Sequence, residues 1–248
     1  MERRKYRNPP IEEAICELRF APGPEAEFTA PARFYESVKS SYPGKPKHQH
    51  ILAAELQARP EGSQMSMRQA EVKILFPSED DRRLVGLGTN VLSVHVVRPY
   101  PGWEDFRPRI EEAVRAYANA ASPAGVTRLG LRYVNKIEIK SEVLNLGEYL
   151  TVAPNLPDGL PLNILTFVTR LETAYPDEPI QLALTVASVE PSAPGAAAVL
   201  LDIEVKREWP NEPLPLSDVM GVVDELRRRE REGFESFITN AARELFDA

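Results

Sequence analysis

The stretch TRLGLRYVNKIEIK, residues 127–140, decides the fold class of this chain. Apolar and polar residues alternate along it, and its apolar face carries Leu129, Leu131, Tyr133, Ile137 and Ile139. Its polar face carries Arg128, Arg132, Lys136 and Glu138. A period of two residues predicts a β-strand with one buried face and one face toward solvent or a ligand, which is typical of antiparallel sheets.

Outward from this strand, the hydrophobic period switches between two and about 3.6 residues, and proline clusters separate the segments. Further strands are expected at 13–20, 50–59, 66–76, 82–88, 90–97, 162–174, 179–189 and 197–208. Helices are expected at 25–41, 102–121, 144–152 and 217–246. The last should have a bend or a protruding segment near Gly233, where the charged run LRRREREGFE interrupts its apolar stripe.

This order of elements divides the chain into two similar halves, residues 1–123 and 124–248. Each half is predicted to contain a strand, a helix, three or four further strands and a second helix. The links between strands are too short for parallel crossovers, so the fold class is α+β with a largely antiparallel sheet, in one continuous domain. The topology resembles that of the TATA-binding protein, which would make a saddle with helices on one face. Residue-level repetition is absent, so a duplication is a hypothesis only.

The amino-acid composition excludes several kinds of site and of protein. One cysteine, Cys16, excludes a disulfide framework and cysteine-based zinc sites, and the pair His48 and His50 lacks a third metal ligand nearby. No cofactor, metal or catalytic motif is expected. No apolar run approaches a membrane span and no secretory signal opens the chain, so a cytoplasmic protein is expected.

Polar residues on the two expected first strands form the first candidate ligand site. Its members are Glu13, Arg19, Arg128, Arg132, Asn135 and Lys136. Arginine binds anions through a planar fork, so the cluster could serve an enzyme or sensor of an anionic small molecule, with Glu13 or Glu17 as acid or base. The structural alternative pairs the charges with Glu138, Asp202 or Glu204, and it satisfies Asn135 internally.

The last helix offers a candidate interaction surface, formed by Arg227, Arg228, Arg231 and Phe234. Intervening glutamates and a net charge of −7 argue against nucleic acid. A salt-bridged solvated face or a surface for a protein partner fits better.

Three motifs in order carry a family resemblance: Asn8 to Ala14 (NPPIEEA), Gly130 to Ile137 (GLRYVNKI) and Phe234 to Thr239 (FESFIT). Together they resemble a sporadically distributed family of uncharacterised bacterial and archaeal proteins of about this length. Members often carry a histidine one or two turns before the last motif, where Arg227 to Arg229 stand here. The resemblance implies no activity, and its patchy occurrence suggests mobile or defence-linked genes.

The leading hypothesis is therefore a non-enzymatic binding module that acts through an exposed sheet face or its long C-terminal helix. A protein partner or a homodimer is expected, and a membrane partner is not.

Overall fold

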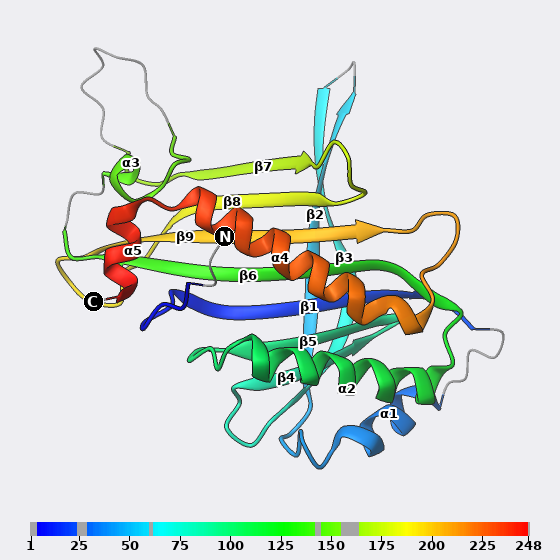
Figure 1. Cartoon of the computed structure of the whole chain (residues 1–248). Coiled ribbons are helices and arrows are strands. Elements are labelled where there is room, and N and C mark those ends of the chain that lie inside the picture. Colours follow the sequence, from blue (N-terminus) through cyan, green and yellow to red (C-terminus); the bar gives the residue numbers. More distant parts are fainter. Residues whose placement is uncertain (1–3, 24–28, 60–61, 142–144, 155–163, 248) are drawn as a thin grey trace.

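The computed structural model describes residues 4–23, 29–59, 62–141, 145–154 and 164–247, with only the backbone described for residues 49–72. Figure 1 shows an α+β fold built on one antiparallel sheet. Its strands are β1 (Ile11–Ala21), β2 (Lys47–Arg59), β3 (Gly62–Pro77), β4 (Arg83–Gly88), β5 (Val91–Val97), β6 (Gly125–Ile139), β7 (Val168–Ala174), β8 (Gln181–Val189) and β9 (Ala197–Glu208). Its α-helices are α1 (Ala30–Val38), α2 (Trp103–Ala121), α3 (Leu146–Tyr149), α4 (Val219–Phe237) and α5 (Asn240–Asp247).

All nine strands form a single sheet in the order β2-β3-β4-β5-β1-β6-β9-β8-β7. The first strand of each half, β1 and β6, pair with each other at the centre, and in each half the last strand pairs with the first. The α+β class with an antiparallel sheet is thus confirmed, and the halves share one continuous sheet.

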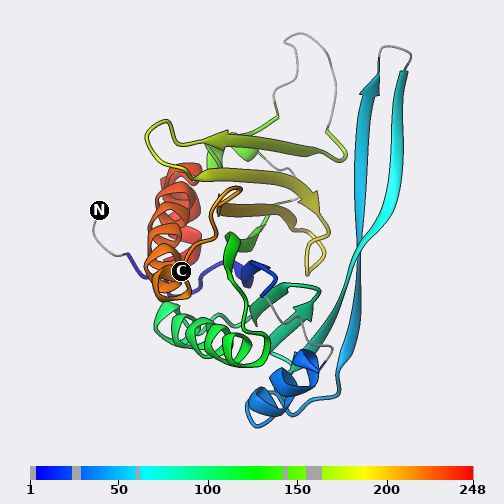
Figure 2. The same cartoon turned by 90° about the vertical axis from the view of Figure 1, so that its right-hand side faces the viewer.

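Helices cover one face of this sheet, as the edge-on view in Figure 2 shows for α2 and α4. Helix α2 packs on β5, and α4 packs on β6 and β9. The alternation expected for residues 127–140 holds, because Leu129, Leu131, Tyr133 and Ile137 are buried on the helix-covered face. We call the opposite face the open face.

The β2–β3 hairpin stands across the open face, roughly crosswise to the central strands, in both views. The sheet curls toward this face where β3, β4 and β5 meet. At Gly86 of β4, a Cβ atom would lie 2.4 Å from Ser93 Oγ and 2.8 Å from Leu75 Cδ2. Side chains from β3 and β5 therefore occupy the space beside Gly86, which has no side chain of its own. As a result, Ser93 and His95 are buried although they lie on the open face.

Substituting Gly86→Ala should lower the free energy of unfolding by about 1–2 kcal/mol, because the added methyl group overpacks the curl. The matched control is Gly221→Ala in α4, where the new Cβ would have no described atom within 4 Å apart from its chain neighbours and the nearby backbone of the helix itself. There the change should stabilise the protein by about 0.5–1 kcal/mol through helix propensity. Denaturant unfolding of the two variants measures the difference, and equal effects would contradict tight packing at Gly86.

The long C-terminal helix is divided at a different place from the one expected. The backbone of Ile238 is extended, with φ −107° and ψ 150°, and it forms a β-bridge with Leu150 that separates α4 from α5. The prediction of a bend near Gly233 is wrong. Gly233 is buried inside α4, and a Cβ atom added there would lie 3.1 Å from Leu182 Cδ1, so the glycine allows close packing of the helix on the sheet.

Candidate functional site

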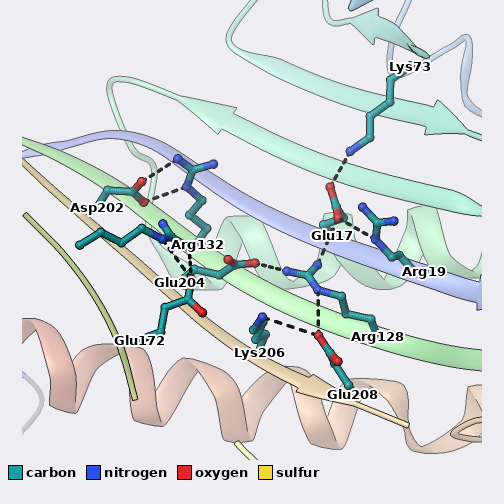
Figure 3. Close-up of polar contacts among 11 residues, drawn as sticks. Glu17, Arg19, Lys73, Arg128, Arg132, Glu172, Asp202, Glu204, Lys206 and Glu208 are labelled. Carbon is teal, nitrogen blue, oxygen red and sulfur yellow. Dashed lines mark hydrogen bonds and ion pairs between the residues drawn. The ribbon is translucent and has the colours of Figure 1, made fainter. Parts of the chain in front are cut away.

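The open face carries a network of paired charges on β1, β6 and β9 (Figure 3). Arg132 holds Asp202 with a two-point fork, Nε to Oδ1 at 2.8 Å and Nη2 to Oδ2 at 2.6 Å. Arg128 lies among three carboxylates, with Nη1 3.1 Å from Glu17 Oε1, Nη2 hydrogen-bonded to Glu204, and Nε 3.7 Å from Glu208. These charges neutralise one another across neighbouring strands.

The remaining members of the first candidate site fall on both faces. Glu13 contacts His95 Nδ1 at 2.8 Å, Arg19 lies 3.4 Å from Glu17, and Lys136 lies 2.9 Å from Glu138, all on the open face. Asn135 lies on the helix-covered face, where its amide donates to the carbonyls of Tyr133 and Leu201. The structure thus brings five of the six residues to one face and pairs them internally, as the structural alternative predicts, and it places Asn135 elsewhere.

Glu17 is a largely enclosed carboxylate of the open face, with a side chain that is 22% exposed. It hydrogen-bonds Lys73 of β3, whose side chain is only 4% exposed. Burial raises the pKa of Glu17, but the hydrogen bond from Lys73 and the charges of Lys73, Arg128 and Arg19 outweigh it, so the pKa lies below its ordinary value. An ionised Glu17 therefore ties the curled half of the sheet to its centre.

A cavity of about 310 Å³ lies on the other face. The N-terminal segment, the start of α2, β6 and α4 enclose it. Its lining includes five basic side chains and three acidic ones, namely Arg4, Lys5, Arg7, Arg227 and Arg231, with Glu104, Glu230 and Glu235. Aromatic and amide side chains complete the wall: Tyr6, Tyr100, Trp103, Tyr133, Phe234 and Asn135. We call this the α4 cavity.

Arg227 is the most constrained cation in the α4 cavity. Its guanidinium carbon lies 4.5 Å from the ring centre of Tyr133 and 5.5 Å from that of Trp103. Its Nη1 bonds Glu230, whereas its buried Nε has no hydrogen-bond partner among the described residues. A buried donor without a partner costs about 1–3 kcal/mol, so this one needs an explanation.

Glu230, one helical turn after Arg227, has a side chain that is only 3% exposed. Burial raises the pKa of this carboxyl above its ordinary value, although Arg227 and Arg231 act in the opposite direction. Beside the pair, the hydroxyls of Tyr100 and Tyr133 lie 3.0 Å apart. Burial raises the pKa of both tyrosines, so both keep their protons at neutral pH and can donate.

The N-terminal segment closes the α4 cavity by binding the C-terminal helices. Tyr6 donates a hydrogen bond of 2.8 Å to Glu235 and packs edge-on against Phe234 and Phe246. The Asn8 N–H donates to the carbonyl of Phe246, and Lys136 N–H donates to the carbonyl of Pro10. Residues 6–10, which lead into and begin the NPPIEEA motif, therefore form an arm that docks within its own chain.

The structure also separates the four residues of the interaction surface that was expected on the last helix. Arg227, Arg231 and Phe234 line the α4 cavity together with Asn135. Arg228 is 51% exposed and pairs with Glu232 on the solvent side. The charged run is thus salt-bridged and partly buried, whereas the sequence favoured a salt-bridged solvated face or a surface for a partner.

Sequence reasoning did not single out Glu230, Tyr100 or Trp103 as members of one cavity lining. A signal for Glu230 was present, because it continues the apolar stripe four residues after Leu226, where a carboxylate must be buried. Tyr100 left no such signal, since it lies in the proline-rich link before α2.

No group of three His, Cys, Asp or Glu side chains in the described part of the chain is placed to hold a metal ion. His48 is exposed at the start of β2, and the side chain of His50 lies outside the described residues. No described helix combines the length and the apolar character that crossing a membrane requires. Comparison with protein-family models finds no match to this sequence, and comparison with curated proteins finds no similar protein.

Proposed function

We propose that the protein binds a small organic anion, a carboxylate or phosphate ester with an apolar body, in the α4 cavity. The observation that carries the proposal is Arg227, a residue that lines this cavity and whose buried Nε has no hydrogen-bond partner in the part of the chain that the structure describes. An anion that pairs with this guanidinium would supply the missing acceptor.

The same chain illustrates the binding mode on its other face. There Arg132 uses Nε and Nη2 together to hold a carboxylate. In Arg227 the bond to Glu230 comes from Nη1, so an anion would have to engage Nε and Nη2, and the buried Nε becomes available when the guanidinium turns toward the cavity as the anion binds. Five basic side chains against three acidic ones give this cavity a positive balance in a chain of net charge −7. The volume falls at the lower end of ordinary ligand sites, which suits a ligand with one aromatic ring.

Glu230 would respond to the bound anion. A carboxyl whose pKa is already raised takes up a proton readily when a second negative charge arrives beside it. Binding should therefore be accompanied by proton uptake, and affinity should rise as the pH falls toward the pKa of Glu230.

Calorimetric titration with benzoate and phenyl phosphate tests the proposal, with benzamide as the uncharged comparison. Both anions should bind, benzamide should bind at least tenfold more weakly, and the observed heat should depend on the ionisation enthalpy of the buffer. Arg227→Lys should weaken binding at least tenfold, because lysine keeps the charge but loses the fork and the stacking.

Arg228→Lys is the matched control, since it makes the same change on the next residue of α4, outside the cavity. Equal affinities of the two variants, or no binding of either anion to the unmodified protein, would count against the proposal.

A second candidate is a protein partner on the open face, as the leading sequence hypothesis has it. The observation that favours it is that the helices leave this face uncovered and Arg132 stays 47% exposed within its ion pair. Charge reversal of Arg132 should then abolish capture of the partner and leave anion binding in the α4 cavity unchanged.

A further inference from the structure

Strand β7 ends the sheet, and no strand in the described residues pairs with its outer side. Figure 1 shows it along the upper border of the sheet. The large hydrophobic side chains that are exposed in the described chain are all on or just before this strand: Ile164, Leu165, Val168 and Leu171. Leu165 is 88% exposed and Val168 is 75% exposed. Neither proline nor lysine interrupts Val168–Ala174, although natural edge strands commonly use them to block pairing.

The direction of the backbone groups is fixed by the bonds to β8. Ser188 N–H donates to the carbonyl of Phe167, and Tyr175 N–H donates to the carbonyl of Ile180. Odd-numbered residues of β7 therefore face β8. Since inward and outward residues alternate along an antiparallel edge strand, Val168, Arg170, Glu172 and Ala174 direct their N–H and C=O groups to the free edge.

We propose that two copies of the protein pair antiparallel through β7, about a two-fold axis at Leu171, and so join their sheets. In this register Arg170 lies opposite Glu172 of the second copy, and Glu172 lies opposite its Arg170. Both residues direct backbone groups outward, so these positions form hydrogen-bonded pairs. Leu171 faces Leu171 of the second copy in a non-hydrogen-bonded pair, where side chains approach closest.

The charges select this register over its neighbours. An axis at Arg170 would set two arginines against each other, and an axis at Glu172 would set two glutamates against each other. If the axis lay between two residues, backbone groups that point to the free edge would lie opposite backbone groups that point to β8, and the two strands could not form hydrogen bonds. Axes at Thr169 or Thr173 would set Arg170 or Glu172 opposite uncharged residues, whereas the axis at Leu171 sets each of them opposite a residue of opposite charge. Charge complementarity, which a two-fold interface repeats on both copies, therefore favours Leu171. Seven-residue strands bury a modest area, so the dimer should depend on protein concentration.

Sedimentation over a concentration series tests the charge pattern. Arg170→Glu and Glu172→Arg should each raise the dissociation constant of the dimer at least tenfold, because each sets like charges opposite each other. The double variant R170E/E172R restores opposite charges and should recover the dimer. A monomer at every concentration, or a dimer that both single variants leave unchanged, would overturn the proposal.

Cysteine cross-linking tests the register itself. Leu171→Cys should give a disulfide-linked dimer under mild oxidation, since Cα atoms of a non-hydrogen-bonded pair lie within disulfide range. Thr173→Cys on the same face of β7 should not, because its partner is Thr169 of the second copy. The native Cys16 is fully buried and does not compete. Equal cross-linking of the two variants would exclude the axis at Leu171.

Discussion

Replacing Arg227 by methionine is expected to lower the free energy of unfolding at pH 7 by about 3–5 kcal/mol, because it leaves Glu230 buried without its partner. Methionine fills much of the volume between Tyr133 and Trp103, so the loss is mainly electrostatic. Urea denaturation, followed by tryptophan fluorescence, measures it.

The loss should depend on pH with a definite sign. Burial already raises the pKa of Glu230, and removing Arg227 removes an opposing influence, so the pKa rises further. A carboxyl whose pKa is higher in the folded state than in the unfolded state favours folding at low pH, and this contribution is lost as the pH rises through the folded pKa. The R227M variant should therefore regain stability relative to the double variant R227M/E230Q as the pH falls toward 4.5, the ordinary value for glutamate.

Two controls separate the buried pair from a general loss of charge. Arg228→Met changes the neighbouring exposed arginine and should alter stability by less than about 0.5 kcal/mol. The double variant R227M/E230Q should recover more than half of the loss at pH 7, because no buried charge is then left alone. A double variant as unstable as R227M would mean that packing accounts for the loss.

Substituting Glu17→Gln is expected to cost about 3 kcal/mol at pH 7, since Lys73 would keep a buried charge without a partner. The pKa of Glu17 lies below its ordinary value, so its contribution is present above about pH 4.5 and is lost as the pH falls below that value. The difference in unfolding free energy between the unmodified protein and E17Q should accordingly shrink in acid. Denaturant unfolding at pH 7 and pH 4 makes the comparison.

Glu36→Gln is the matched control, because Glu36 pairs with Lys39 on the exposed side of α1. It should cost less than about 1 kcal/mol. Adding Lys73→Met to E17Q should restore most of the stability by removing the orphaned ammonium group. If E17Q and E36Q behaved alike, the bond between β1 and β3 would contribute nothing to the curl.

Much of the sheet could be predicted from the alternation of side chains, because that pattern is local. The strand at residues 127–140 and the helix at 102–121 lie within two residues of their predicted ends. The break between α4 and α5 could not be predicted, since it depends on a bridge between Ile238 and Leu150, which are far apart in sequence. Gly233 suggested a bend because a glycine beside a charged run is a weak point in an isolated helix, whereas packing against Leu182 preserves the helix here.

The candidate site, like the helix break, depends in part on contacts between residues that are far apart in the sequence. Alternation correctly separated Asn135 from Arg132 and Lys136, but it could not tell what lies above each face. Asn135 meets Arg227 in the α4 cavity only because α4 crosses β6, and the helix and the strand are nearly a hundred residues apart. Charge pairing on the open face followed from residue types alone, since arginine and glutamate at neighbouring strand positions pair in most registers.

The docked arm also has a consequence for how the protein folds. Tyr6 and Glu235, which hold the arm in place, are separated by 229 residues, so their contact closes almost the whole chain into a loop. Contacts of such separation form late, because the entropy of loop closure must be overcome before they stabilise anything. A nascent chain still on the ribosome can build β1 to β5 and α2, but it cannot enclose a ligand until α4 has emerged. Binding of the kind proposed for the α4 cavity would thus require that α4 has already been synthesised.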